Sequence, residues 1–99
     1  MPVQAASEEE IQAFLSTSPE WSRVEGKLYR EYHFRDFIQA FGFMTQAALQ
    51  IEKQNHHPEW CNAYRTVVVY LSTHEAGGIS ERDFLLATTM DRVAASLQA

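Results

Sequence analysis

Histidines are the residues of this sequence best suited to chemistry, because an imidazole ring can donate or accept a proton near neutral pH. His56 and His57 are adjacent and directly precede Pro58, and His74 follows 18 residues after His56. Two or three imidazoles around a flat ring could protonate a leaving hydroxyl group and take a proton from a neighbouring nitrogen. The pattern therefore indicates an acid–base site, provided that the fold brings these histidines together. The fourth histidine, His33, is predicted to be a surface or interface residue on a strand.

Residues near these histidines have a structural as well as a chemical interpretation. Asp83 is the third helical residue of a capping box, Ser80–Asp83, and that role alone accounts for its presence. The His-His-Pro run can simply end a helix, where histidines interact favourably with the helix dipole. Trp60 offers flat apolar surface to a bound ring, but a tryptophan is more often a core or interface residue.

A metal site is the competing chemical interpretation, because His56, His57 and His74 supply three nitrogen ligands. Adjacent residues on an extended chain point in opposite directions, so His56 and His57 cannot easily bind one ion together. The sequence also lacks HExxH and CxxC spacings. Cys61 is the single cysteine, so it forms no internal disulfide, and nothing in its surroundings indicates an activated thiol. We therefore expect no metal.

Length and composition describe a small globular protein. The 99 residues suit one domain, and 45% of them are hydrophobic, which argues against disorder. Eight basic and 13 acidic residues give a net charge of −5, which argues against direct binding to nucleic acid or to a membrane surface. No apolar run has the length of a membrane helix, and the acidic stretch 1–10 does not resemble a secretory signal. A cytoplasmic location is expected.

Hydrophobic periodicity and turn residues divide the chain into helices and strands. Residues 1–6 are expected to form a disordered tail, and residues 7–99 a single domain. Helices are predicted at 7–16, at 36–54, and from the capping box at residue 80 to about residue 97. Strands are predicted at 21–24, 28–34 and 60–71, with 72–75 continuing the sheet after a bend. The order α-β-β-α-β-β-α predicts an α+β fold of two layers, a four-stranded antiparallel sheet with three helices on one face.

Several segments resemble the pterin-4a-carbinolamine dehydratase family, which is also known as the dimerisation cofactor of a homeodomain transcription factor. The stretch 56–64, HHPEWCNAY, resembles the family's signature. Residues 34–37 and 40–44 resemble its long helix, and residues 71–75 and 78–83 resemble its second active-site segment and the start of its last helix. The combined segments span about residues 21–95 and are highly specific, whereas the HHP run alone is not.

The resemblance implies an enzyme that dehydrates 4a-hydroxytetrahydropterins to quinonoid dihydropterins with no metal or other cofactor. This reaction regenerates the cofactor of aromatic amino acid hydroxylases. The family's three catalytic histidines match His56, His57 and His74, and its supporting aspartate matches Asp83. The positions expected to bind the pterin are His56, His57, Pro58, Trp60, Thr73, His74, Glu75 and Ala76.

The resemblance also implies partners. Family members join sheets edge to edge in a dimer and pack dimers through the long helix, so a homodimer or homotetramer is expected, with helix 36–54 at the interface. Some members use the same helix surface to bind a transcription factor. The matching motifs belong to the catalytic site, so they do not imply this second role for the present chain. A non-catalytic transcriptional cofactor or binding protein on the same fold is the main alternative function. A third possible function is another role in pterin chemistry, such as molybdopterin metabolism.

Overall fold

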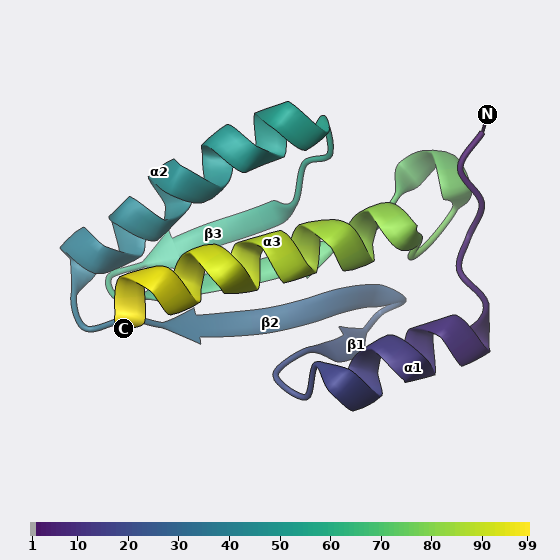
Figure 1. Cartoon of the computed structure of the whole chain (residues 1–99), viewed down its shortest axis with the longest axis horizontal. Helices are drawn as coiled ribbons and strands as arrows, with labels where there is room; N and C mark the ends of the chain where they lie inside the picture. Colours follow the sequence, from purple (N-terminus) through teal and green to yellow (C-terminus); the bar gives the residue numbers. More distant parts are fainter. Residues whose placement is uncertain (1) are drawn as a thin grey trace.

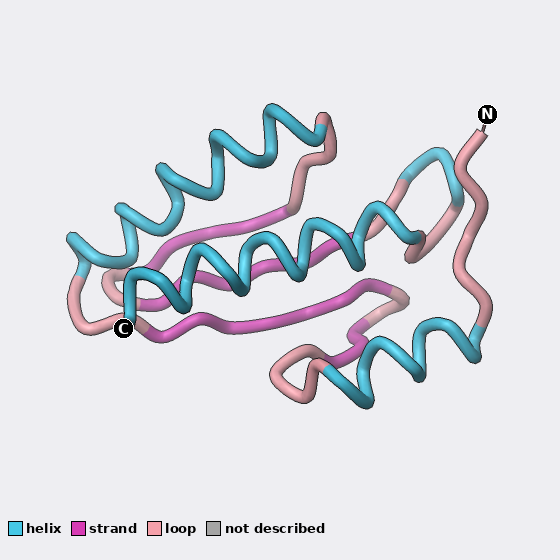
Figure 2. The backbone as a smooth tube through the Cα atoms, viewed as in Figure 1, coloured by secondary structure: helices cyan, strands magenta, loops and turns pink. Residues whose placement is uncertain are grey.

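The computed structural model describes residues 2–99; Met1, which belongs to the predicted tail 1–6, lies outside the described residues. Three helices cover one face of a four-stranded sheet (Figure 1), and the same two layers are visible in the backbone trace (Figure 2). The predicted α+β class and element order are confirmed. The elements are α1 (Glu8–Thr17), β1 (Ser22–Val24), β2 (Lys27–His33), α2 (Phe37–Gln54), β3 (Glu59–Ala63), β4 (Thr66–Leu71), a short 3-10 helix η1 (His74–Ala76) and α3 (Glu81–Gln98).

All neighbouring strands of the sheet are antiparallel, in the order β1-β2-β4-β3. Alternate residues of β2 and β4 face the helices, which is the period of two that strands impose on their side chains. These inward side chains pack against α2 and α3 in one core. Its largest fully buried apolar members are Tyr32, Phe43, Leu28, Leu71, Leu86, Met90, Val67 and Val69.

The prediction of one continuous strand over residues 60–71 is wrong. The chain reverses at Tyr64 and Arg65, so β3 and β4 form a hairpin. Tyr64 adopts a backbone φ of 55°, a value that residues other than glycine seldom take. The amide of Asn62 stabilises the turn by donating to the carbonyl oxygens of Tyr64 at 2.9 Å and Thr66 at 3.0 Å. Apolar alternation continues on both sides of this turn, and the sequence contains no glycine or proline to mark it.

The prediction that residues 72–75 continue the sheet is also wrong. The chain forms η1 at this point, and a single bridge between Thr73 and Gly78 closes the loop. Gly77 has a φ of 74°, which glycine adopts readily because it has no β-carbon. This conformation lets the chain turn back after η1. The fourth strand of the sheet is therefore β3, and residues 72–78 form a loop.

Helix boundaries follow the capping signals in the sequence. Both predicted capping boxes are present, at the starts of α1 and α3. In α2, the carboxylate of Asp36 accepts a hydrogen bond from the amide of Gln39 at 2.8 Å. Asn55 ends this helix in a left-handed conformation with a φ of 52°, which directs the chain toward β3. His56 and His57 therefore follow directly after a fixed helix end.

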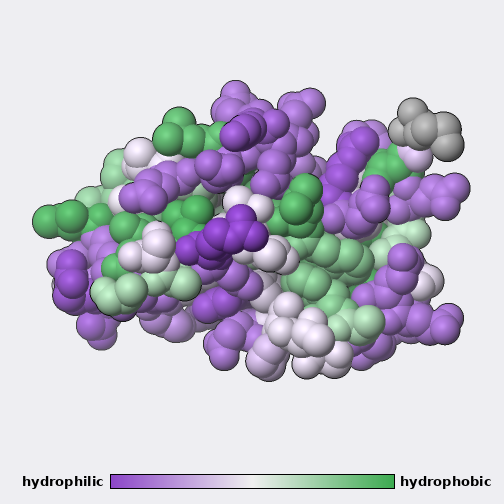
Figure 3. All heavy atoms as spheres, in the orientation of Figure 1, coloured by the Kyte–Doolittle hydropathy of each residue, from purple (hydrophilic) through white to green (hydrophobic). Residues whose placement is uncertain are grey.

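The surface carries apolar side chains along α2. Phe37, Ile38, Phe41 and Leu49 are between 46% and 80% exposed, and their spacing places them beside one another on a face of the helix that does not contact the sheet. Figure 3 shows hydrophobic atoms over the first turns of this helix. Among the residues that the structure describes, no helix combines the length and apolarity needed to cross a membrane.

Candidate active site

Three separate chain segments meet at one end of the sheet. Glu59 at the start of β3 pairs with Tyr70, near the end of β4, so residues 55–58 lie beside the loop 72–78. Leu28 pairs with Leu71, so the β1–β2 turn reaches the same end. The antiparallel register thus brings the His56-His57 segment and the loop that contains His74 to one edge of the molecule.

His56 contacts Asp83 directly. The Nε2 atom of His56 lies 2.6 Å from Oδ1 of Asp83, with side chains 10% and 0% exposed respectively. His56 follows the left-handed Asn55, and Asp83 is the third residue of α3, so two helix ends create this contact. A short bond between a buried carboxylate and an imidazole is strong because the carboxylate is charged.

The second carboxylate oxygen of Asp83 holds the neighbouring loop. Oδ2 accepts hydrogen bonds from the hydroxyl of Thr73 at 2.8 Å and from the amide of Ser80 at 2.9 Å. The hydroxyls of Thr73 and Ser80 are also 2.6 Å apart. A buried carboxylate needs such partners, and the N-terminus of α3 adds a favourable dipole. Asp83 is therefore fixed in place, with Oδ1 directed at the imidazole.

This arrangement suits proton transfer. A carboxylate bonded to one ring nitrogen orients the imidazole and stabilises its protonated form. In the described part of the chain, Nδ1 of His56 makes no hydrogen bond. The structure shows one of the predicted histidines, His56, in contact with Asp83 in a mostly buried setting.

The other two predicted histidines lie outside this network. His57 is exposed, with its Nε2 atom 3.6 Å from Oε2 of Glu52. His74 is also exposed and begins η1, directly after the buried Thr73. The structure therefore joins His56 and Thr73 through Asp83, and it leaves His57 and His74 exposed on the surface. No group of three or more metal-binding side chains occurs among the residues described.

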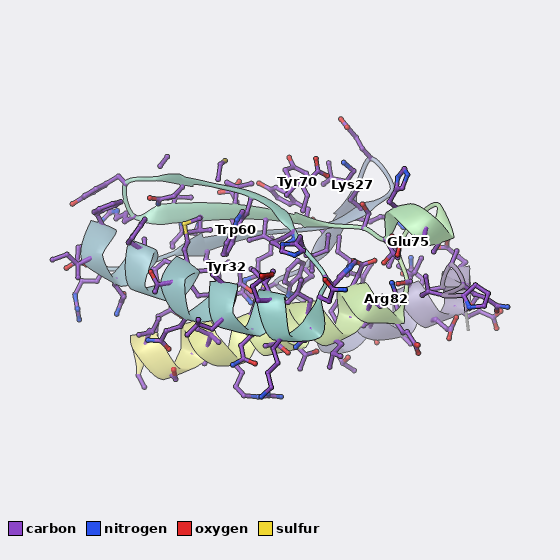
Figure 4. The ribbon with its side chains drawn as sticks, turned by 90° about the horizontal axis from the view of Figure 1, so that it is seen from above. Lys27, Tyr32, Trp60, Tyr70, Glu75 and Arg82 are labelled. Carbon is purple, nitrogen blue, oxygen red and sulfur yellow. The ribbon has the colours of Figure 1, made fainter. Side chains whose placement is uncertain are left out.

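The remaining predicted pocket residues have distinct surroundings. Trp60 is half-buried and its ring meets Phe43 edge to face at 6.5 Å, while Pro58 and Ala76 are half-buried. Glu75 is exposed and accepts a hydrogen bond from Arg82 at 3.1 Å; the two side chains lie together beside η1 in Figure 4. A hydrogen bond from its own backbone amide and the guanidinium of Arg82 lower the pKa of Glu75. The Glu75 carboxylate is thus held as an anion beside the loop.

Two features of the site were not predicted from the sequence. The buried hydroxyl of Ser80 joins the Thr73 and Asp83 network, although Ser80 was predicted only to cap a helix. Lys27, the first residue of β2, places its Nζ atom 2.5 Å from Oε1 of Glu59 at the same end of the sheet. The strand pairing alone could have indicated that the start of β2 lies near the site.

The fold and the contact network together define a small α+β protein with a mostly buried histidine–aspartate contact at one end of its sheet. Residues 4–93 match the family model described as Pterin 4 alpha carbinolamine dehydratase, and this chain belongs to that family.

Relatives cover nearly the whole chain. A protein of Solibacter usitatus that is assigned to the pterin-4-alpha-carbinolamine dehydratases is 56% identical over 89 residues, covering 90% of this chain and 94% of the relative. One of Nitrobacter winogradskyi with the same assignment is 50% identical over 94 residues, covering 93% of each. A crystal structure from Brucella melitensis, described as a transcriptional coactivator/pterin dehydratase, is 43% identical with a TM-score of 0.87, covering 92% of this chain and 99% of that one.

Proposed function

We propose that this protein converts a 4a-hydroxytetrahydropterin to a quinonoid dihydropterin and water by histidine acid–base catalysis. The observation that carries the proposal is the 2.6 Å contact between His56 and the buried Asp83, at the end of the sheet where the predicted site segments meet. Family membership supports the substrate class and the reaction. We place the reaction in the recycling of the pterin used by aromatic amino acid hydroxylases, in the cytoplasm.

The reaction needs two proton transfers and no change of oxidation state. A protonated imidazole donates its proton to the 4a hydroxyl as the C4a–O bond breaks, and water leaves. The N5–H bond supplies the electron pair that forms the C4a=N5 double bond, and its proton passes to a base. One proton is given and one is taken, so the number of protons on the protein is unchanged, and a proton passing from the base to the acid through solvent restores the starting state.

We assign the roles as follows. His56 or His74 is the general acid on the 4a hydroxyl, and His57 accepts or stabilises the proton from N5. Asp83 orients His56 and favours its protonated form, because a carboxylate stabilises an adjacent imidazolium. We assign no step to a metal or cofactor. Pro58, Trp60, Thr73, Glu75 and Ala76 complete the proposed pterin site.

The test uses purified protein and chemically generated 4a-hydroxytetrahydropterin, with formation of the quinonoid product followed by absorbance. We expect catalysis well above the spontaneous rate, and the same rate after treatment with a strong chelator. A rate equal to that of the buffer would contradict the proposed activity. Loss of the rate on chelation, with recovery on adding a divalent ion, would contradict metal-free catalysis.

One observation favours a second function, which is binding to another protein surface through α2. The exposed apolar face of α2 is suited to burial against another surface, because soluble monomers seldom leave such side chains together in water. The proposed occupant is a second copy of the chain, which would give a homodimer or homotetramer. A protein partner on the same helix is the alternative, because the Brucella protein is described as a coactivator as well as a pterin dehydratase.

A further inference from the structure

Most of the buried polar side chains of this protein lie in one place. Among the residues that the structure describes, the buried polar or charged side chains are Thr73, Ser80, Asp83 and Thr89. The first three are bonded to one another behind His56, whereas Thr89 lies further along α3. Two buried hydroxyl groups are therefore devoted to one buried carboxylate.

The direction of each hydrogen bond in this network follows from counting protons. A hydroxyl group carries one proton, and an ionised carboxylate only accepts. The proton of Thr73 therefore lies in its 2.8 Å bond to Oδ2 of Asp83. The 2.6 Å contact between the hydroxyls of Thr73 and Ser80 must then use the proton of Ser80, whose oxygen accepts the amide of Arg82 at 3.2 Å. The bonds thus run in one direction, toward Asp83.

This series of hydrogen bonds ends at the contact between Asp83 and His56. Because the ionised carboxylate only accepts, the proton in the 2.6 Å contact belongs to Nε2 of the imidazole. Hydrogen bonds that run in one direction polarise one another, so each donor strengthens the next. By holding Oδ2, the Thr73 hydroxyl keeps Oδ1 directed at His56.

The polar atoms of Thr73 all have partners within the described part of the protein. Its amide donates to the carbonyl oxygen of Gly78 at 2.8 Å, and its carbonyl oxygen accepts from the amides of Ala76 at 3.1 Å and Gly78 at 3.3 Å. Its hydroxyl is bonded inside the network, and the residue is only 1% exposed. Thr73 therefore lies in a predicted pterin-binding segment but presents no free polar group to a bound molecule.

We infer that Thr73 and Ser80 are positioning residues, which hold Asp83 so that it orients His56, and that the side chain of Thr73 does not bind the pterin. This inference rests on the proposed function and changes the role of Thr73 within the proposed site. Loss of a pterin contact raises KM, whereas loss of support for an acid–base group lowers kcat and leaves KM unchanged. Kinetics can therefore distinguish the two roles.

The first test compares Thr73→Val and Thr73→Ser with the unchanged protein on a 4a-hydroxytetrahydropterin. Valine has nearly the shape of threonine but no hydroxyl, so kcat should fall about 3- to 30-fold while KM stays within about twofold. Thr73→Ser restores the hydroxyl and should keep kcat within about threefold. Thr89→Val, at the buried threonine outside the network, is the matched control and should leave both constants within about twofold. A raised KM with unchanged kcat in Thr73→Val would make Thr73 a pterin contact instead.

A second comparison asks whether Thr73 acts through Asp83. In an Asp83→Asn background, adding Thr73→Val should lower kcat by less than about twofold, because the carboxylate that Thr73 supports is already gone. The same fold loss in both backgrounds would contradict action through Asp83.

A measurement without substrate separates this inference from the proposed function. Hydrogen bonding moves the NMR signal of an imidazole N–H proton downfield, so the Nε2 proton of His56 reports its contact with Asp83. We expect Thr73→Val to change this chemical shift and Thr89→Val to leave it unchanged. If Thr73→Val does not fold, Ser80→Ala should change the same shift, because it removes the donor to Thr73.

The outcomes of the two kinds of measurement are distinct. A protein that does not dehydrate the pterin would contradict the proposed function, while the chemical shift still tests the hydrogen bonds behind His56. An unchanged shift in Thr73→Val, or in Ser80→Ala where the first variant is unfolded, would overturn the positioning role whatever the activity.

Discussion

Asp83 serves the fold and the proposed chemistry with the two oxygens of one carboxylate. Oδ2 holds the amide of Ser80 and the hydroxyl of Thr73, which fixes the start of α3 against the loop before it. Oδ1 contacts His56, which orients the imidazole. The capping interpretation and the catalytic interpretation of this residue are therefore compatible, because they use different atoms.

Replacing this carboxylate by an amide should separate the two tasks. We expect Asp83→Asn to lower kcat about 10- to 1,000-fold, since the amide cannot stabilise a protonated His56. The free energy of unfolding should fall by about 1 to 3 kcal/mol, because buried donors lose a charged acceptor. Pterin dehydration and urea unfolding measure the two effects.

The matched control for Asp83→Asn is Glu10→Gln, at the same position of the capping box of α1. It makes the same acid-to-amide change at a helix start with no histidine contact, so kcat should stay within about twofold. If Asp83→Asn kept full kcat while losing stability, Asp83 would be a capping residue only.

Local sequence signals predicted part of this site. Ser80–Asp83 was identified as a capping box because that motif involves only neighbouring residues. The contact between Asp83 and His56 links residues 27 positions apart, so it depends on how α2 and α3 pack and no local spacing reveals it. Only the family resemblance connected these residues before the structure did.

At the scale of elements, Asp91 of α3 ties the helix to the sheet. It accepts hydrogen bonds from Trp21 Nε1 at 2.9 Å, Arg30 at 2.8 Å and the Tyr32 hydroxyl at 2.5 Å. Burial and the adjacent Asp91 carboxylate raise the pKa of Tyr32 well above its ordinary value. The neutral phenol is therefore the form that the fold stabilises.

This contact predicts a pH-dependent stability. Because the folded-state pKa of Tyr32 is raised, its contribution is complete below the unfolded value of about 10 and is lost as the pH rises above it. Tyr32→Phe should cost about 1 kcal/mol at pH 7. Between pH 9 and 11, urea unfolding should show the unchanged protein losing stability more steeply than Tyr32→Phe.

A suitable control for Tyr32→Phe is Tyr64→Phe, at a 66% exposed ring in the β3–β4 turn. Its free energy of unfolding at pH 7 should match that of the unchanged protein within about 0.5 kcal/mol. Parallel pH profiles for Tyr32→Phe and the unchanged protein would show that the buried phenol does not limit stability at high pH.

The elements were predicted unevenly for physical reasons. Capping residues placed the helices to within a residue or two, because caps act locally. The β3–β4 hairpin was missed because Tyr64 adopts positive φ without a glycine, and the Asn62 side chain stabilises the turn instead. Apolar and polar residues alternate on both sides of the turn without interruption. Periodicity alone therefore could not show that residues 60–71 form two strands.

At the scale of the whole molecule, the exposed face of α2 predicts self-association. Sedimentation velocity should show the unchanged protein as a dimer or tetramer. Phe41→Glu should shift it to a smaller species, because burying an added charge opposes the contact. Tyr64→Asn, which also removes an exposed aromatic ring, should not change the sedimentation. An unchanged protein that sediments as a monomer would contradict the proposed assembly.

The most direct test of the whole account measures pterin dehydration by four single variants, His56→Ala, His57→Ala, His74→Ala and His33→Ala. Acid–base catalysis by the first three predicts a fall in kcat of about 100-fold or more for at least His56→Ala, and smaller or equal losses for the other two. His33, exposed at the far end of β2, should be replaceable without loss. Full activity in all of the first three variants would contradict the proposed mechanism.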